Sequence, residues 1–332
     1  MIFRKSSYSL IGGIIALLVI TGYQTYQYAE QLWNHRVLDK QQLYTLKENT
    51  RLIDVFEQLH PLAPQQRFVL KGWLRLYPQL AKIKAGTYQL PAQASFAKIA
   101  AILRSGNVYQ YHITFVDGET MTQWWQQLQQ APGIKINQAS LTQVTAELGF
   151  SNGNMEGWLL PETYYYTQGT TAEALLNRAY QAMRQFLAQT WQTRKAGLPI
   201  RSPYQLLVLA SIIEKETGEV EEMPKVASVF VNRLHQHMRL QSDPTVIYGL
   251  GDAYTGNLTR ANLRQKTRYN TYVIYGLPPT PIAMPGRSAI QAAAHPANTN
   301  YYYFVADGSG GHHFSVNLQE HNQAVRKYIL KR

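Results

Sequence analysis

The sequence contains no cysteine in its 332 residues. This absence excludes a disulfide framework, a thiolate metal site, a cysteine nucleophile and lipid attachment to an N-terminal cysteine. Charged residues are also scarce, at 16% against 45% apolar residues, so the chain has enough apolar material for a proper core and extended disorder is not expected. The length favours two compact units with additional segments.

The sequence also lacks any run of five or six basic residues, although its formal net charge is +12. A positive charge of this size favours an anionic partner, which from charge alone is nucleic acid, lipid headgroups or an acidic cell-wall polymer. The Lys and Arg residues are scattered, and no basic arm typical of nucleic-acid binding is present.

Long apolar runs are absent except near the N-terminus, where residues 7–23 carry no charge and follow Arg4 and Lys5. This length is near the lower limit for a membrane-spanning helix, roughly 17–25 residues, and the tyrosines that follow fit an aromatic belt. A cleaved signal peptide is the alternative, but no small-x-small cleavage site follows the run. We therefore expect a cytoplasmic N-terminus at residues 1–7, a transmembrane helix at residues 8–27 and a body outside the cytoplasm.

The rest of the chain predicts an α+β fold in two parts. A helical or extended stalk at residues 28–42 leads to a small unit at residues 43–117, then a linking region at 118–150 and a larger mixed α+β domain at 151–332. The elements expected in the small unit are strands at 44–46, 85–90 and 108–116 and helices at 50–59, 68–76 and 95–105, the first capped by Thr50 and the last ended by Gly106. A Trp-rich helix is expected at 124–128.

An apolar helix is predicted over residues 206–218. Leu207, Ala210 and Glu214 are spaced i, i+3 and i+7, so they share one apolar stripe, and Glu216 lies off it. A carboxyl group against an apolar wall has a raised pKa and keeps its proton near neutral pH. This is what a general acid for a glycosidic oxygen requires. The alternative is that Glu214 pairs with an Arg or caps a helix end.

Other carboxylates leave two interpretations open. Asp243 precedes Pro244, which is typical of a helix N-terminus, so Asp243 is either a cap or a second catalytic carboxylate. Glu156 and Glu162 flank a short Trp- and Pro-containing segment and serve either structure or catalysis. A proline-rich loop at 276–286 predicts a stiff rim, which suits an extended polymer or simply braces the fold.

The C-terminal region shows no cofactor signature. A Gly-rich turn at 307–315 follows a predicted strand at 301–306 and lacks the lysine of a phosphate-binding loop. The His pairs at 312–313 and at 235 and 237 lack metal-like partners at helical spacing. We therefore expect no nucleotide, metal or other cofactor.

Taken in order, these segments resemble the endolytic transglycosylases of the MltG family, also called YceG-like proteins, which cut the glycan strands of peptidoglycan. The matching motifs are Ala-Gly-Thr-Tyr at 85–88, Glu-Gly-Trp-Leu-Leu-Pro-Glu-Thr-Tyr at 156–164, Leu-Ala-Ser-Ile-Ile-Glu-Lys-Glu-Thr at 209–217, Leu-Gln-Ser-Asp-Pro-Thr at 240–245, Tyr-Asn-Thr-Tyr at 269–272, Gly-Leu-Pro-Pro at 276–279 and Phe-Val-Ala with His-Phe within 304–314. The following Thr280 and Pro281 depart from the smaller residues expected there.

The resemblance implies that Glu214, the first Glu of Ile-Glu-Lys-Glu-Thr, protonates the bond between N-acetylmuramic acid and N-acetylglucosamine. The same carboxylate then acts as base on the muramic acid 6-hydroxyl, which leaves a 1,6-anhydro end and consumes no water. The residues expected to contact substrate or orient Glu214 are Gln241, Ser242, Asp243, Tyr269, Asn270 and Glu156.

The resemblance also implies a LysM-like subdomain for the small unit and a single-pass location in the inner membrane, with the body in the periplasm. The expected partners are peptidoglycan glycan strands, the membrane, peptidoglycan synthases and elongation or division proteins. Nucleic acid is not expected because the anchor places the body in the wrong compartment. The alternative function is a non-catalytic LysM-type scaffold that binds peptidoglycan for the cell-wall synthesis machinery.

Overall fold

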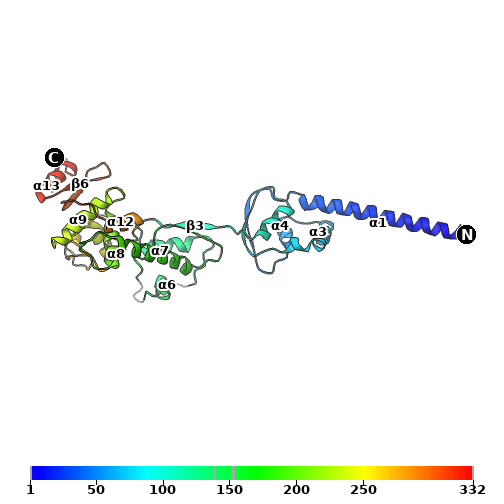
Figure 1. The fold of residues 1–332 in the computed structure, drawn as a ribbon, viewed down its shortest axis with the longest axis horizontal. Helices are drawn as coiled ribbons and strands as arrows, with labels where there is room; N and C mark the ends of the chain where they lie inside the picture. The colour runs from blue at the N-terminus through cyan, green and yellow to red at the C-terminus, as the bar shows by residue number, and fades with distance from the viewer. Residues whose placement is uncertain (1, 138–139, 151–153, 331–332) are drawn as a thin grey trace. The chain divides into compact units, whose positions relative to one another are not determined.

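The computed structural model describes residues 2–137, 140–150 and 154–330, with residues 2–11 described only as part of helix α1. The chain forms two compact units, Met1–Tyr111 and His112–Arg332, drawn from blue to cyan and from cyan to red in Figure 1. The described residues form a mixed α+β fold with three two-stranded sheets, so the predicted class is confirmed. The boundary between the two units, after Tyr111, falls a few residues before the expected end of the small unit at residue 117.

The small unit packs helices beside one antiparallel strand pair. Its elements are α1 Ile2–Asn34, β1 Gln42–Leu46, α2 Leu52–Leu59, α3 Pro64–Leu76, the 3-10 helix η1 Pro78–Ala81, β2 Gly86–Leu90 and α4 Phe96–Ser105. Tyr44 of β1 lies opposite Tyr88 of β2. The Ser95 side chain caps α4 by accepting from the Lys98 amide, and Gly106 ends the helix with φ 75°, as predicted.

The prediction that Thr50 caps α2 is wrong. This helix begins at Leu52, its N-cap position is Arg51, and no side chain there accepts a hydrogen bond. Arg51 instead donates from Nε to the Asp54 carboxylate at 2.7 Å. Thr50 therefore lies one residue too early to cap the helix.

The stalk expected at residues 28–42 is also wrong, because this segment is part of the core of the small unit. Helix α1 continues to Asn34, and Leu32, Trp33 and Leu38 are buried. The Trp33 ring meets Phe56 edge-on, with centroids 5.9 Å apart. Burying a side chain of this size contributes roughly 1.5–3 kcal/mol, so the segment stabilises the unit.

Among the residues that the structure describes, no helix is long and apolar enough to cross a membrane. Helix α1 contains the segment 8–27 for which a span is expected. The side chains of residues 1–11, which include the expected cytoplasmic N-terminus at 1–7 and the first residues of that segment, lie outside what the structure describes.

The larger unit is mostly helical. Its elements are β3 Tyr111–Thr114, which begins at the boundary, α5 Met121–Gln130, α6 Leu141–Glu147, β4 Thr163–Tyr166, α7 Ala172–Thr193, α8 Pro203–Glu216, α9 Met223–His235, α10 Asp243–Leu250, the 3-10 helix η2 Gly251–Ala253, α11 Arg260–Arg264, α12 Arg287–Ala294, β5 Tyr303–Ala306, β6 His312–Ser315 and α13 Leu318–Tyr328. Strand β3 pairs with β4, and β5 forms an antiparallel hairpin with β6.

The region 118–150 belongs to this larger unit. Helix α5 begins at Met121 behind a capping box at Thr120, so it is longer than the predicted 124–128. Its Trp124 is fully buried and stacks on Phe115 at 3.9 Å between ring centroids. Residues 138–139, within this region, and residues 151–153, at the start of the predicted domain, lie outside the described residues.

Helix α8 forms the centre of the core. Every residue from 206 to 213 is buried, and the helix contacts α7, α9, α10 and α12. A helix enclosed on all sides has no single apolar stripe, so its sequence pattern does not show which way a later carboxylate points. The helix ends at Glu216 with Thr217 in extended conformation, two residues before the predicted end at Gly218.

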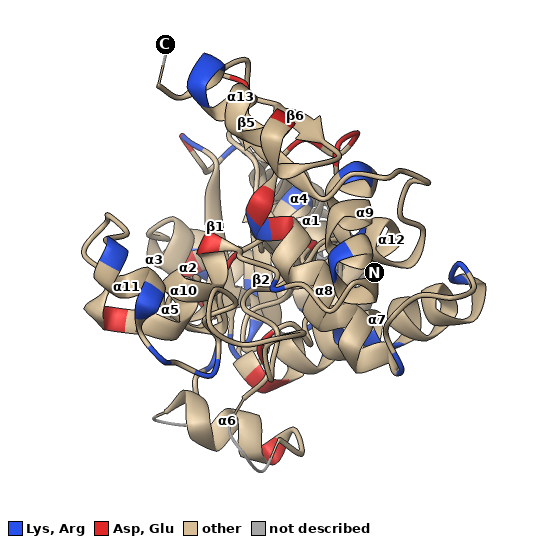
Figure 2. Ribbon diagram, turned by 90° about the vertical axis from the view of Figure 1, so that its left-hand side faces the viewer, with Lys and Arg blue, Asp and Glu red and all other residues tan. Residues whose placement is uncertain are grey.

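Positive charge is spread over the structure. Figure 2 shows Lys and Arg on several helices, among them α7 and α13. Two of those on α7 are engaged within the protein, since Arg178 donates to the Tyr165 carbonyl at 2.7 Å and Arg184 lies over the Tyr180 ring at 5.5 Å. Part of the basic charge therefore serves the fold.

Candidate functional site

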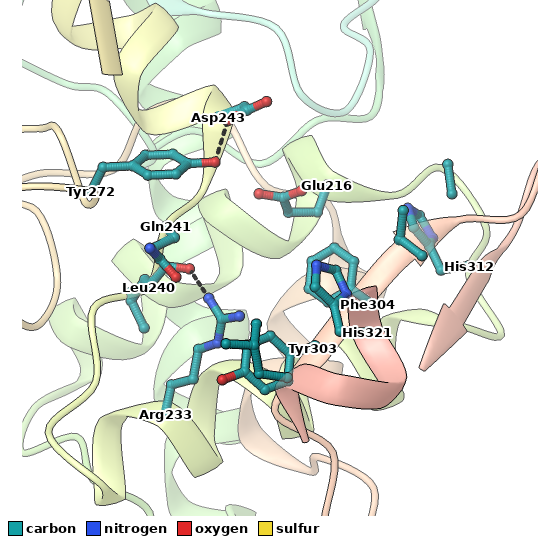
Figure 3. Close-up of a pocket in the computed structure, with 13 residues that line it drawn as sticks. Glu216, Arg233, Leu240, Gln241, Asp243, Tyr272, Tyr303, Phe304, His312 and His321 are labelled. Atoms are coloured by element: carbon teal, nitrogen blue, oxygen red, sulfur yellow. Dashed lines mark hydrogen bonds between the residues drawn. The ribbon is translucent and has the colours of Figure 1, made fainter. Parts of the chain in front are cut away.

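A cavity of about 460 Å³ lies in the larger unit, where the C-terminal end of α8 meets the β5–β6 hairpin. Its lining combines aromatic, acidic and basic side chains drawn from α8, α9, the start of α10, the hairpin and α13 (Figure 3). The polar residues used below are Glu216, Arg233, Gln241, Asp243, Tyr272, His312 and His321. Glu214 is not part of this lining.

Glu216 is the last residue of α8 and projects into the cavity. Figure 3 shows its side chain between the Asp243–Tyr272 pair and the side that carries Arg233. Burial raises the pKa of Glu216 to about 7, the negative Asp243 adds to this, and a hydrogen bond from Ser242 opposes it. The negative end of the helix also disfavours the ionised carboxylate. At neutral pH this carboxyl group can therefore both give and take a proton.

Ser242 is fixed against Glu216 by the surrounding backbone. Its Oγ donates to Glu216 Oε1 at 2.5 Å. Its backbone N–H donates to Thr271 Oγ1 at 2.9 Å, and its carbonyl accepts from Thr245 Oγ1 at 2.6 Å. Ser242 occupies the N-cap position of α10, yet its side chain makes no capping bond. The hydroxyl is bonded to the carboxyl group instead.

Asp243 and Gln241 line the same cavity on either side of Ser242. Asp243 is the first residue of α10 rather than its cap, and its Oδ1 accepts from the Tyr272 hydroxyl at 2.6 Å. Gln241 has φ 49°, an uncommon conformation for a residue with a side chain, which costs energy and tends to occur at functional sites. The structure thus brings three predicted site residues together, around Glu216 rather than Glu214.

Glu214 has a different environment. Its Oε2 accepts from the Gly286 N–H at 2.9 Å, at the N-terminus of α12. Burial raises its pKa to about 7, and the nearby Asp117 charge raises it further, against the Gly286 bond. A Cβ on Gly286 would lie 2.5 Å from the Asp117 carboxyl carbon, so the glycine makes room for that group. The contact matches the alternative that Glu214 serves a helix end.

Glu156 and Tyr269 are held in a buried network away from the cavity. Glu156 accepts from the Met121 N–H at 3.1 Å and from the Tyr248 hydroxyl at 3.3 Å. Tyr269 packs against Tyr248, with ring centroids 4.9 Å apart, and its hydroxyl bonds Thr280 at 3.0 Å. Neither residue lines the cavity.

Asn270 is fully buried and braces the backbone. Its amide nitrogen donates to the Gln265 carbonyl at 2.8 Å and to the Leu263 carbonyl at 3.1 Å, at the end of α11. Its amide oxygen accepts from the Tyr272 N–H at 2.9 Å. These bonds use the donors and acceptor of the side chain, so its place in the structure favours support of Tyr272 over contact with substrate.

The buried Glu156 makes the stability of the larger unit depend on pH. Burial raises its pKa to about 7, opposed by its bonds from Met121 and Tyr248. A folded-state pKa above the unfolded value gives full stability below about pH 4.5, and stability is lost as pH rises to about 7. We expect Glu156→Gln to reduce the difference in free energy of unfolding between about pH 5 and about pH 8 by roughly 2–3 kcal/mol.

Denaturant unfolding of the full chain in detergent, followed at both pH values, measures this effect. Glu320→Gln is the control, because Glu320 is exposed on α13. An unchanged pH dependence in Glu156→Gln would show that the group is ionised in the folded protein.

Arg233, His312 and His321 at the cavity were not indicated as site residues by the sequence. Arg233 is buried and donates to the Tyr302 carbonyl at 2.7 Å and the Leu240 carbonyl at 2.6 Å, so it joins the hairpin to the loop before Ser242. His312 Nδ1 lies 2.9 Å from Glu222 Oε2. His321 Nδ1 has no hydrogen-bond partner among the described residues.

The sequence offers only weak signals for these residues. Arg233 occupies an ordinary position within α9, and the two histidines are brought to the cavity by the hairpin and α13. Within the described part of the chain, no group of three or more His, Asp or Glu side chains is placed to hold a metal ion.

An enclosed carboxyl group with a pKa near neutrality that lines an open cavity, here Glu216, defines a candidate general acid–base site. The model of the YceG-like family matches residues 44–327, and the chain belongs to this family. The resemblance noted in the sequence is therefore confirmed.

Two relatives and one solved structure illustrate the similarity. The chain is 38% identical over 175 residues to an endolytic murein transglycosylase of Bacillus subtilis, covering 53% of this chain and 48% of the relative. It is 26% identical over 353 aligned residues to the enzyme of the same name from Streptococcus pneumoniae serotype 2, covering 95% and 64%. The chain thus spans about half to just under two thirds of the relatives it matches. A crystal structure of a putative YceG-like protein of Listeria monocytogenes superposes with a TM-score of 0.52 at 27% identity, covering 86% of this chain and 99% of that one.

Proposed function

We propose that the chain is an endolytic murein transglycosylase, which cleaves the bond between N-acetylmuramic acid and N-acetylglucosamine in peptidoglycan strands. The names of the relatives from Bacillus and Streptococcus support the reaction. The observation that carries the proposal is the Glu216 carboxyl group, enclosed enough to have a pKa of about 7 yet open to the cavity.

The reaction needs one group that acts first as acid and then as base. Protonated Glu216 donates to the glycosidic oxygen as that bond breaks and positive charge develops at C1 of the muramic acid. The Glu216 carboxylate then takes the proton of the muramic acid 6-hydroxyl, and the oxygen of that hydroxyl bonds to C1. The products are a 1,6-anhydro end and a free N-acetylglucosamine hydroxyl, Glu216 regains its proton, and no water is consumed.

Ser242 supports the state between these two steps. Its hydroxyl donates to Glu216, and such a bond stabilises the ionised carboxylate that exists after the first proton transfer. A pKa near 7 keeps the group able to perform both transfers at neutral pH. Tyr272 and Tyr303 line the cavity with flat rings that suit the faces of sugars.

The geometry favours Glu216 over Glu214 as this group. Glu216 reaches the cavity together with Gln241 and Asp243. Glu214 bonds the backbone of Gly286 and does not line the cavity. Catalysis by Glu214, which the resemblance implies, stays the alternative, and the bond to Gly286 favours a positioning role for Glu214 at the N-terminus of α12.

Product analysis tests the proposed reaction. Glycan strands are digested with the purified full chain in detergent, and their new ends are identified by mass spectrometry. Anhydro-muramic ends are expected. Reducing ends would indicate hydrolysis, in which Asp243 serves as a second carboxylate. An absence of cleavage with retained glycan binding would favour a non-catalytic scaffold.

We further propose that α1 anchors the chain in the inner membrane, with the body in the periplasm and the small unit acting as a LysM-like subdomain. The uncharged run at 7–23, preceded by Arg4 and Lys5, supports this arrangement. Substrates near the membrane are nascent strands, and the neighbouring proteins there are peptidoglycan synthases and elongation or division proteins. Retention of the full chain in the membrane pellet after carbonate extraction tests the anchor.

A further inference from the structure

Helix α3 in the small unit exposes large apolar side chains that the core does not use. Phe68 is 80% exposed and Leu76 is 68% exposed, whereas Leu70 and Trp73 of the same helix are buried. Phe68, Gly72 and Leu76 are spaced four residues apart, so they form one outward stripe along the helix. Exposed apolar side chains aligned in this way mark a binding surface.

This stripe continues onto α1. An open apolar groove of about 710 Å³ lies between the two helices, lined by Leu18 and Ala29 of α1 and by Phe68, Trp73 and Leu76 of α3. Figure 1 shows α3 beside α1. Tyr26 and Trp73 meet at 5.4 Å between ring centroids, which fixes the two helices together.

The charge beside the stripe has one sign. Lys71 and Arg75 are exposed on α3 next to Phe68 and Leu76, and the helix contains no acidic residue. An apolar stripe flanked by basic side chains and aromatic rings is typical of a helix that lies in the surface of an anionic membrane. A soluble protein partner would not require this combination of an open apolar groove and a positive margin.

We infer that α3 is an interfacial membrane helix: Phe68 and Leu76 enter the acyl region of an anionic phospholipid bilayer beside α1, and Lys71 and Arg75 contact the headgroups. This inference rests on the proposed membrane association of α1. It adds a second attachment, which holds the small unit against the bilayer instead of leaving it free on a single helix.

The absence of cysteine makes a direct test simple, because any introduced cysteine is the only labelling site. The full chain is reconstituted into vesicles of phosphatidylglycerol and phosphatidylethanolamine with the environment-sensitive fluorophore NBD at Phe68→Cys, at Leu17→Cys of α1, or at Gln89→Cys on β2. Leu17 is 66% exposed on α1, and Gln89 is an exposed residue of the strand pair. Quenching by lipids that carry a nitroxide on the acyl chain is measured for each.

We expect at least a twofold quenching at positions 17 and 68 and almost none at 89. Quenching at 17 but not at 68 overturns the inference and leaves the anchor in place. No quenching at either position overturns both. A blue shift at 68 without lipid quenching shows that protein covers the stripe, which also overturns the inference.

The basic margin is tested in the Phe68→Cys background. Lys71→Glu with Arg75→Glu is expected to remove at least half of the quenching at 68, because the headgroups then repel the helix. Lys47→Glu with Lys98→Glu is the matched control, since both lysines are exposed on the same unit and neither lines the groove. An equal loss in the two double variants would contradict a specific contact by α3.

Discussion

Glu216→Gln is expected to reduce glycan cleavage by about 10²–10⁴-fold, the contribution of a general acid–base group. The amide has nearly the shape of the carboxyl group and still accepts from Ser242, so the local structure is preserved. It cannot donate a proton to a glycosidic oxygen or take one from a hydroxyl. The measurement is the initial rate of release of anhydro-muramic ends from isolated glycan strands.

Glu214→Gln is the matched comparison. Its bond from the Gly286 N–H is kept by an amide oxygen, and the variant loses only a carboxyl group that does not line the cavity. We expect this variant to retain most of the cleavage rate. The opposite ranking, with Glu216→Gln active and Glu214→Gln inactive, would return the catalytic role to Glu214. Equal melting temperatures in both variants are required before the rates are compared.

The elements that the sequence predicted best are those with local signals at both ends. Helix α4 has a capping serine at Ser95 and a left-handed glycine at Gly106, and both positions were predicted. Helix α2 lacks a side-chain cap, and its predicted start was wrong. The stalk was wrong for another reason, because the burial of Leu32 and Trp33 depends on residues distant in the chain.

The site residues also divide into those that a local motif indicates and those whose position depends on contacts between distant parts of the chain. The motif around residues 240–245 contains two residues that line the cavity, Gln241 and Asp243, and Ser242 between them, which bonds Glu216. Glu214 and Glu216 are two residues apart and point roughly 200° away from each other around a helix. Only one can face the cavity, and a helix buried on all sides gives no pattern that selects it. Asn270 was predicted from its motif as a substrate or orienting residue, but its buried bonds at the end of α11 depend on the fold.

The dependence of the cleavage rate on pH separates a single-carboxyl mechanism from a two-carboxyl one. Burial raises the pKa of Glu216 to about 7, so the free protein has the required proton below that pH and loses it above. We expect kcat/KM to be level below about pH 7 and to fall about tenfold per pH unit above it. The base is created by the first proton transfer, so Glu216 adds no acidic limb. A bell-shaped profile would indicate a second titrating group, as in a hydrolase with paired carboxylates.

Ser242→Ala should move this alkaline limb. The Ser242 hydroxyl stabilises the ionised form of Glu216, so its removal raises the pKa further, and the limb shifts upward by about one pH unit. The plateau rate should fall as well, because the carboxylate formed after the first transfer loses its hydrogen bond. Ser228→Ala is the control, since Ser228 is buried in α9 and bonds the Lys225 carbonyl instead. A limb that moves to lower pH, or that moves equally in both variants, would contradict the role of Ser242 as a positioning residue for Glu216.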